Sequence, residues 1–593
     1  MFLRSKWKCN KEEVVAANGA VTAMHSPSAE AGLEMLKSGG NAIDSAVAMG
    51  FCDVVLEPYM ACIGGLGYML IHLAKEQKTI GIDFIGRAPQ KAYPEMYRIV
   101  GPAPTGSFRV FSVENDANNE GPLSVTVPGT CAGLCLAHKL YGTLPLEQML
   151  EPAIHLASEG FEADWHLTLF ISNELGFFSR DPIIASMWLN NGLPPRSVTK
   201  ASLGELEMSK SMVRDKIVQR DLGELLKRIA RQGADALYKG EVAEAIDEFM
   251  RKKGGLLTKK DLDEYKPGIL EPISVSFKGY DIMTVGVPNM ATTSLEIFGT
   301  LDNFDLKALG HNSVDYLHLS IETARHAFAD CWRYLGDWDY VPVPLRGLLS
   351  KEYTKELAQQ VDLKKAIVEL ELDRAPWSFY VERAIHDPWK YDPSSNCGES
   401  FEPAEPTHQG DTTHLNVVDK DRNVVTCTHT GAFSPGALPP GTGAYLAGFM
   451  SFFIPKAGYA NSVAGWKRPL MVSPLMVFKD GRPVLCQGAP GGRRIVHRGV
   501  QVVTNVLVFG MTPQEAIAQP TVDANDFYNI LDSRLPDDVP NKLERLGHRV
   551  TVVEEEPGML GNFSRPSAIY IDYEAGVVRA GVDVFRPATA LGY

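Results

Sequence analysis

The strongest constraint on the fold is a change of pattern close to residue 411. Residues 366–411 are rich in Pro, Ser, Glu and Asp and show no period, which is the composition of a loop or tether. From Thr412 onward, short stretches alternate between apolar and polar residues, which predicts strands. The chain before the tether is mainly helical in pattern, as in residues 25–40 and 41–58, with a glycine-rich turn at 62–72. Strands that feed one core, with helices outside them, predict a layered α/β or α+β architecture.

The first two of these strands form a predicted hairpin, TTHLNVV (412–418) and NVVTCTHT (423–430). Closing the hairpin pairs Val418 with Val424, and counting outward places Thr412 opposite Thr430. Directly opposed residues have Cβ atoms about 4.5–5.5 Å apart, so a second hydroxyl would lie beside the first threonine. Alone, such a pair is an ordinary polar contact between strands, and a one-residue slip of register would undo it.

Composition limits the classes of protein that fit. The chain has 593 residues, of which 45% are hydrophobic and 22% charged, so it is long enough for a large core. Its net charge of −14 argues against a general nucleic-acid binder, which carries a basic face. No segment has the apolar run of a secretory signal or of a membrane-spanning helix. The nine cysteines are scattered without a Cys-x-x-Cys pair, which indicates reduced thiols and a cytoplasmic location.

Further motifs extend over nearly the whole chain and occur in the order found in one known family. With the Thr-Thr-His hairpin they resemble the γ-glutamyltransferase family of N-terminal nucleophile hydrolases. These motifs are GLEMLKSGGNAIDSAVA (32–48), EPYMACIGGLGYML (57–70), VPGTCAGLCLAHKLYGTLP (127–145), GGLLTKKDLDEY (254–265), RYLGD (333–337), KRPLMVSP (467–474), GAPGGRRI (488–495) and RPATALGY (586–593).

The resemblance implies an α+β fold, a four-layer αββα sandwich with two stacked antiparallel sheets. It also implies cleavage between Asp411 and Thr412. A large segment, 1–411, and a small segment, 412–593, would then form a heterodimer, and whether two heterodimers associate is left open. Members of this family cut their own chain to expose the catalytic threonine.

The chemistry of such a site explains why a threonine must become a chain terminus. A hydroxyl is a weak nucleophile and needs a base beside it. The α-amine freed on Thr412 has an ordinary pKa of about 7.7–8.0, so part of it is neutral near physiological pH. The family resemblance assigns Thr430 as the hydrogen-bonding partner of the nucleophile, and Gly491 and Gly492 as the backbone donors of the oxyanion hole. Without the resemblance, the two glycines would indicate only a tight turn.

The residues that hold the glutamyl group in this family are largely replaced here. Ala432 stands where the family has asparagine, Phe449 and Phe452 lie close to the positions of amine-binding residues, and Met471 replaces the first serine of a pair. Asp83-Phe84 is followed by isoleucine, not by the carboxylate-binding arginine, and Arg87, two residues further on, is the candidate substitute. Together with Ala432, Phe449, Phe452, Met471 and Arg493, Arg87 is a candidate residue of the substrate pocket. An ammonium or carboxylate buried among such side chains would lack compensation, at several kcal/mol each. We therefore expect a more apolar acyl group.

A basic cluster, which includes Arg493, follows the glycine pair and either holds a small acid or marks the start of a helix. We expect an autoprocessing hydrolase or acyltransferase that acts on a small-molecule amide or related acyl substrate. The alternatives are a true γ-glutamyl hydrolase or transpeptidase, a hydrolase of carbon–carbon bonds, and a non-catalytic binding protein. We expect no cofactor and no metal, because the histidines lack ligand spacing and no phosphate-binding or dinucleotide motif is found.

Overall fold

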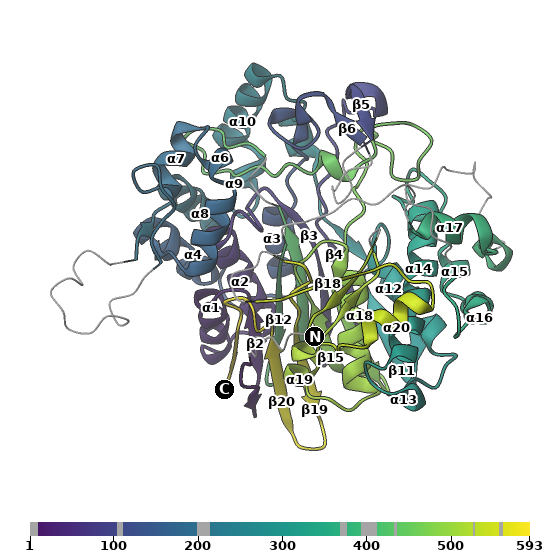
Figure 1. Ribbon diagram of the computed structural model, residues 1–593. Helices are drawn as coiled ribbons and strands as arrows, with labels where there is room; N and C mark the ends of the chain where they lie inside the picture. The colour runs from purple at the N-terminus through teal and green to yellow at the C-terminus, as the bar shows by residue number, and fades with distance from the viewer. Residues whose placement is uncertain are drawn as a thin grey trace.

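The computed structural model describes residues 10–102, 111–197, 214–367, 376–392, 412–431, 436–525, 528–556 and 561–593. Within these residues, two seven-stranded antiparallel sheets lie at the centre, with helices on both sides (Figure 1). Sheet 1 runs from edge to edge as β1 (Val14–Ala16), β20 (Val577–Val582), β19 (Ser567–Asp572), β15 (Arg482–Gly488), β14 (Leu475–Lys479), β11 (Tyr280–Thr284) and β10 (Ile273–Phe277). Sheet 2 runs as β21 (Thr589–Gly592), β2 (Ala20–Ala23), β12 (Thr413–Val418), β13 (Val424–Thr430), β3 (Leu66–Leu73), β4 (Lys78–Asp83) and β9 (Gly268–Leu270).

The inner faces of the two sheets meet around β12. The ring of His414 in β12 occupies the place where a Cβ on Gly488 of β15 would lie, so only glycine permits this approach. Next along β12, the Nδ2 of Asn416 donates to the carbonyl of Ser567 in β19 at 3.2 Å. The stacked antiparallel sheets of the predicted α+β sandwich are therefore confirmed.

Helices cover the outer face of each sheet and complete the four layers. On sheet 2 lie α1 (Ser26–Lys37) and α2 (Ala42–Leu56), and on sheet 1 lie α12 (Ala291–Leu301), α18 (Arg494–Leu507) and α19 (Pro513–Ala518). All fifteen residues of α2 are buried, because the helix packs on α1, on α3 (Thr130–Tyr141) and on the sheet at once. Its start is fixed by a capping box, in which Asn41 and Asp44 bind one another's backbone N–H groups.

Strands from both sides of residue 411 build each sheet. The second segment supplies β14, β15, β19 and β20 to sheet 1 and β12, β13 and β21 to sheet 2, and the first segment supplies the remaining strands. The segments 1–411 and 412–593 are therefore not separate domains. A backbone cut between them would leave both sheets hydrogen-bonded.

Two local predictions are wrong. Residues 62–72 are not only a turn, because β3 begins at Leu66 and pairs with both β13 and β4. Its glycine serves packing, since a Cβ on Gly67 would collide with Phe84 and with the carbonyl of Thr428. The predicted tether contains α17 (Pro376–Arg383), and Tyr380 of this helix is buried. Residues 368–375 and 393–411 of the tether lie outside the described residues.

Seven cysteines fall within the described part of the chain, and all seven are free and buried, as the prediction of reduced thiols requires. Of the helices in the described ranges, none has the length and apolar character needed to cross a membrane.

Candidate active site

The hairpin of β12 and β13 places two threonine hydroxyls together. Val418 pairs with Val424 and Thr413 with His429, as the sequence predicts, so that Thr412 lies opposite Thr430 just beyond the end of β12. The Oγ1 of Thr412 donates to the Oγ1 of Thr430 at 3.2 Å. Both side chains are 2% exposed. A buried hydroxyl pair therefore stands at the first described residue after the tether.

A ladder of polar side chains continues from this pair into the space between the sheets. Because alternate residues of a strand share a face, His414 and Asn416 point to the same side as Thr412. The Nδ1 of His414 lies 2.9 Å from the Oγ1 of Thr428, and the Oγ1 of Thr426 donates to the Oδ1 of Asn416 at 2.7 Å. Each rung thus joins β12 to β13 by side chains as well as by backbone.

The ladder fixes the protonation of His414. The carbonyl of Ser567 can only accept, so the amide nitrogen of Asn416 faces it and the Oδ1 of Asn416 faces His414. The Nε2 of His414 therefore carries the hydrogen, and its Nδ1 accepts from Thr428. Burial lowers the pKa of His414 to about 3. This neutral ring has both nitrogens engaged and is not a free base for Thr412.

The adjacent residues of the hairpin face the helical layer instead. The Nε2 of His429 lies 3.3 Å from Asp53 of α2, and both side chains are buried. The hydroxyl of Thr413 is buried and makes no hydrogen bond within the described residues. Two neighbouring threonines thus differ in environment, and Thr412 alone faces the ladder.

The glycine pair forms a turn between β15 and the start of α18. Gly491 and Gly492 have φ values of +136° and +58°, which favour glycine. A Cβ on Gly491 would collide with the backbone of Ser564, and the hydroxyl of Ser564 donates to the carbonyl of Pro490 at 2.9 Å. Strand β15 ends at Gly488, which packs against His414 of the ladder, and the turn begins two residues later in the chain. Its two N–H groups lie beside the positive end of the α18 dipole.

The basic cluster after the turn mostly packs the helix. The guanidinium of Arg493 lies 4.3 Å from the centre of the Trp332 ring. The Nε2 of His497 donates to Ser320 at 2.8 Å while its Nδ1 accepts from the backbone of Ala524. Burial lowers the pKa of His497 to about 3. Arg498 donates to the carbonyl of Ile517. Of the two readings of this cluster, these contacts favour the helix start.

Phe449 lies beside the end of the hairpin of β12 and β13. A Cβ on Gly431, the residue after Thr430, would come within 3.3 Å of its ring. Its ring centre lies 5.0 Å from that of Phe452 at an interplanar angle of 55°. Phe449 is buried and Phe452 is partly exposed, so an aromatic pair borders this end of the sheet.

The remaining predicted pocket residues have structural contacts of their own. The backbone carbonyl of Met471 accepts from Met290 at 2.7 Å, and its side chain is buried. Arg87 donates to the backbone carbonyl of Trp466 at 3.0 Å, and its guanidinium lies over the indole ring of the same residue. Ala432 of the predicted pocket and Asp411 of the predicted cleavage site lie outside the described residues.

Asp83, the aspartate of the Asp-Phe-Ile sequence, binds Arg468, which lies 385 positions away in the sequence. The Nη1 of Arg468 contacts the Oδ2 of Asp83 at 2.9 Å, and its Nη2 contacts the Oδ1 of Asp337 at 2.6 Å. All three groups are buried. Asp83 therefore serves an ion network that ties β4 to the segment before β14.

A second ion network, in which His25 and Glu57 are buried and Asp164 is partly exposed, supports the loop that holds Gly431. His25 lies 3.4 Å from Glu57 and 3.2 Å from Asp164. Burial alone would lower its pKa, but these two carboxylates raise the pKa of His25 to about 10. The carbonyl of Glu57 accepts from Met60, whose own carbonyl accepts from Gly431. A charged imidazole therefore holds the base of this loop.

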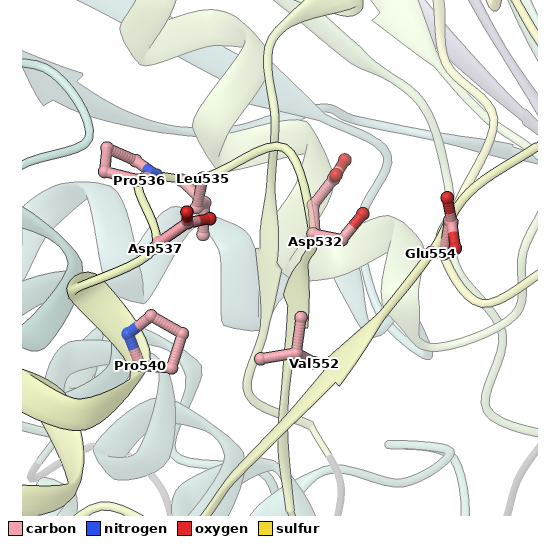
Figure 2. A pocket seen from close by; sticks show the side chains of 8 residues that line it. Asp532, Leu535, Pro536, Asp537, Pro540, Val552 and Glu554 are labelled. Atoms are coloured by element: carbon pink, nitrogen blue, oxygen red, sulfur yellow. The ribbon is translucent and has the colours of Figure 1, made fainter. Parts of the chain in front are cut away.

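A cavity of about 260 Å³ lies elsewhere, where β17 (Asn529–Asp532) ends near α20 (Val539–Arg545) (Figure 2). Asp532, Asp537 and Glu554 are among its lining residues. None of the predicted site residues lines it, and Asp532 is already paired with Arg534 at 2.6 Å.

Sequence reasoning missed the polar ladder and the contact of Ser564 with the glycine turn. The signal for the ladder was present, because polar residues recur at every second position from 412 to 416 and from 426 to 430. Ser564 gave no such signal, because it lies about 70 residues from the turn in sequence.

Comparison with known proteins gives consistent relatives. A family model described as Gamma-glutamyltranspeptidase matches residues 28–593. The glutathione hydrolase proenzyme of Bacillus subtilis (strain 168) is 33% identical over 588 residues, which cover 98% of this chain and 92% of that protein. The acylase ACY 1 proenzyme of Pseudomonas sp. (strain SE83) is 34% identical over 548 residues, which cover 91% of this chain and 89% of that protein. Cephalosporin acylase from Bacillus halodurans is similar in structure, with a TM-score of 0.81 and 26% identity, and the match covers 100% of this chain and 99% of that protein.

Proposed function

Because this chain belongs to the gamma-glutamyltranspeptidase family of N-terminal nucleophile hydrolases, we propose that it cuts itself before Thr412 and then hydrolyses an apolar acyl amide. The observation that carries the proposal is the buried contact of 3.2 Å between the hydroxyls of Thr412 and Thr430. This contact lies at the end of β12, which is hydrogen-bonded to β2 of the first segment and to β13 of the second. The names of the two curated relatives as proenzymes support a self-cutting step.

In the proposed reaction, the hydroxyl oxygen of Thr412 attacks the carbonyl carbon of Asp411, and the peptide C–N bond breaks as the hydroxyl proton passes to the departing nitrogen. Water then hydrolyses the ester that joins Asp411 to the Thr412 oxygen. This frees the α-amine of Thr412 and the carboxylate of Asp411. In the mature enzyme the neutral α-amine accepts the hydroxyl proton as the oxygen attacks the substrate carbonyl. The resulting α-ammonium gives a proton to the leaving amine as the amide C–N bond breaks, which leaves the acyl group as an ester on Thr412. Water then hydrolyses this ester, which releases the acid and restores the hydroxyl. His414 does not compete for this role, because both of its ring nitrogens are engaged in the ladder.

The glycine turn supplies the proposed oxyanion hole. Gly491 and Gly492 present consecutive N–H groups at the start of α18, where the helix dipole favours negative charge. Loss of one such donor typically lowers the rate about 10²–10³-fold. The contact between Ser564 and Pro490 holds the turn in place before substrate binds.

The apolar acyl group is proposed from Phe449 and Phe452. The ring of Phe449 borders Gly431, so it lies next to the residue that follows Thr430. A charged amino-acid head group beside this aromatic pair would lose solvation without gaining a partner. The similarity to an acylase and to a cephalosporin acylase supports the same choice.

A true γ-glutamyl hydrolase is the second candidate, since one relative is named a glutathione hydrolase. The two candidates differ in a direct assay of purified, self-cut protein. A matched series of p-nitroanilides carrying phenylacetyl, glutaryl and γ-glutamyl groups would be compared by kcat/KM. We expect phenylacetyl to be preferred by at least tenfold. Preference for γ-glutamyl would replace the proposal with the second candidate, and hydrolysis of none of the three would count against an amide substrate of either kind.

The products of the self-cutting step are the proposed partners of one another. Segments 1–411 and 412–593 share both sheets, so they would remain associated as a heterodimer after the cut. Size-exclusion chromatography of self-cut protein would give one peak that contains both segments.

A further inference from the structure

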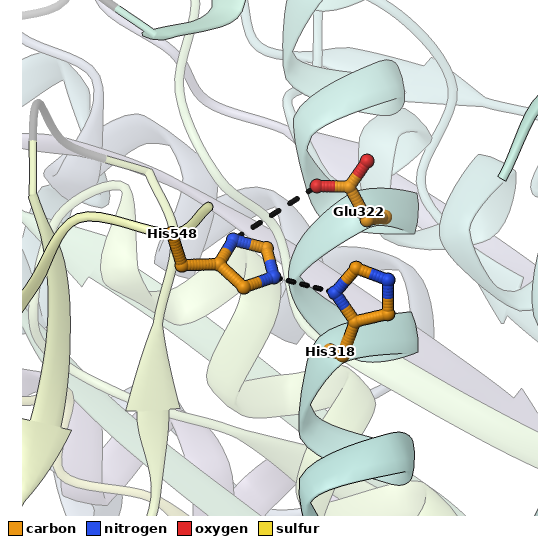
Figure 3. A group of neighbouring side chains, drawn as sticks. All are labelled: His318, Glu322 and His548. Carbon is orange, nitrogen blue, oxygen red and sulfur yellow. Dashed lines mark hydrogen bonds and ion pairs between the residues drawn. The ribbon is translucent and has the colours of Figure 1, made fainter. Parts of the chain in front are cut away.

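Three buried side chains outside the proposed active site come together from distant parts of the chain. His318 and Glu322 lie four residues apart on α14 (Val314–Tyr334), so they share one face of that helix. His548 precedes β18 (Val550–Val553) and reaches the same face (Figure 3). Each residue offers one ligand atom, and the three atoms all lie within 4.8 Å of one another.

We propose that His318, Glu322 and His548 form a binding site for a divalent zinc-type cation that joins the two segments of the chain. Two imidazoles and one carboxylate are a ligand set that zinc accepts, with a fourth position open to water. Sequence spacing predicts no such site, because His548 is separated from His318 by 230 positions. The proposal does not depend on the chemistry at Thr412.

The neighbours of His318 present it as a ligand. Its Nε2 lies 2.8 Å from the backbone carbonyl of Asp362. A carbonyl can only accept, so the Nε2 carries the hydrogen and the Nδ1 has a free lone pair. That Nδ1 faces the Nε2 of His548 at 2.6 Å. Metal-bound histidines commonly donate their other ring hydrogen to a carbonyl or carboxylate in this way.

The carboxylate of Glu322 is held by groups from two further segments. One oxygen accepts from the hydroxyl of Tyr380 at 2.6 Å, and the other accepts from the backbone of Ile367 at 3.2 Å. The Oε1 of Glu322 lies 3.9 Å from the Nδ1 of His548. These contacts orient Glu322 toward the pair of rings.

Because the Nδ1 of His318 accepts, the Nε2–H of His548 donates across the contact of 2.6 Å between the two rings. Zinc would replace that hydrogen, and His548 would then carry its hydrogen on Nδ1, on the side of Glu322. With bonds of about 2.0–2.1 Å, tetrahedral zinc holds its ligand atoms about 3.3 Å apart. Zinc binding therefore increases the distance between the Nδ1 of His318 and the Nε2 of His548 by about 0.7 Å, and moves the carboxylate of Glu322 toward the two rings.

The location of the site gives zinc a structural consequence. His318 and Glu322 belong to the segment 1–411, and His548 belongs to the segment 412–593. A cation bound to all three would link the segments directly, whether or not the backbone is cut. Because it would bind the folded state alone, it would also raise the midpoint of thermal unfolding.

The test uses the full-length protein after removal of metals with a chelator. Zinc chloride would be titrated into wild type, His548→Gln and Glu322→Gln by calorimetry, and metal content would be measured by mass spectrometry. His155→Gln is the matched control, because His155 is an exposed histidine on the surface of another helix, α4 (Leu146–Glu159).

We expect one zinc per chain in wild type and in the control, with a zinc-dependent rise in the unfolding midpoint. Each ligand variant should weaken binding by at least the 10–100-fold that loss of a supporting partner typically costs. Wild type that binds no more zinc than His548→Gln would overturn the proposal and leave a hydrogen-bonded histidine pair. Because the wild-type titration is informative alone, a variant that fails to fold would not rescue it.

Discussion

The hydroxyl of Thr430 offers the sharpest test of how the nucleophile is oriented. Thr430→Val keeps the branched shape of the side chain but removes the oxygen that lies 3.2 Å from the Oγ1 of Thr412. Thr412 is 2% exposed, so water does not replace the lost partner freely. In the proposed mechanism the same hydrogen bond holds the Thr412 oxygen in the transition state, so its loss raises the barrier by the cost of an unsatisfied buried group, about 1–3 kcal/mol. Since 1.36 kcal/mol corresponds to a factor of ten in rate, we expect self-cutting and turnover to slow by about 5- to 150-fold.

Two further variants make this result interpretable. Thr430→Ser restores the hydroxyl and should recover most of the rate. Thr413→Val alters the adjacent residue, whose buried hydroxyl makes no hydrogen bond within the described residues, so its removal should leave both rates unchanged. Self-cutting would be followed by the appearance of two bands on a denaturing gel, and turnover by release of p-nitroaniline. Rates for Thr430→Val within twofold of wild type would refute the proposed orientation of the nucleophile.

Three other predictions concern the surroundings of the site. The pKa of His25 is raised to about 10, so its ion pairs stabilise the folded state fully below pH 6.5, and this stabilisation is lost as pH rises through 10. His25→Gln should therefore lower the free energy of unfolding at pH 6 but not above pH 10. An equal loss at both pH values, measured by urea denaturation, would contradict this. Arg468→Met leaves Asp83 and Asp337 buried without their cation and should lower the free energy of unfolding by about 3–5 kcal/mol in the same assay. A decrease of less than about 1 kcal/mol would show that the network does not stabilise the fold. Phe449→Ala should lower kcat/KM for phenylacetyl substrates by about 10-fold or more relative to acetyl substrates, because an apolar contact worth about 1.5–3 kcal/mol is lost. An unchanged ratio of the two kcat/KM values would show that Phe449 does not line the acyl pocket.

The parts of the fold that sequence predicted well are those set by local pattern. The register of the hairpin follows from a short polar loop and alternating residues on both sides, so the pairing of Val418 with Val424 could be read directly. The helix at α2 was equally plain, since a buried run follows a capping residue at Asn41. Strand β3 was misread because Gly67 resembles a turn residue, although it serves close packing against Phe84.

The parts that could not be predicted depend on contacts between distant segments. Nothing near Arg468 in sequence indicates that it binds Asp83 and Asp337. The cluster of His318 and His548 has the same origin, because its two rings lie 230 positions apart. Local spacing therefore predicted the hairpin of β12 and β13, whereas the positions of the buried charges depend on the folded chain.

The most direct test of the central claim is the mass and N-terminal sequence of purified protein, compared with Thr412→Ala. The account predicts two polypeptides of 411 and 182 residues in wild type, the shorter one beginning Thr-Thr-His-Leu, and their masses should sum to that of the 65.0 kDa chain plus one water. Thr412→Ala should remain a single intact chain. Active wild-type protein that consists only of the intact chain, or that is cut at another bond, would contradict the account.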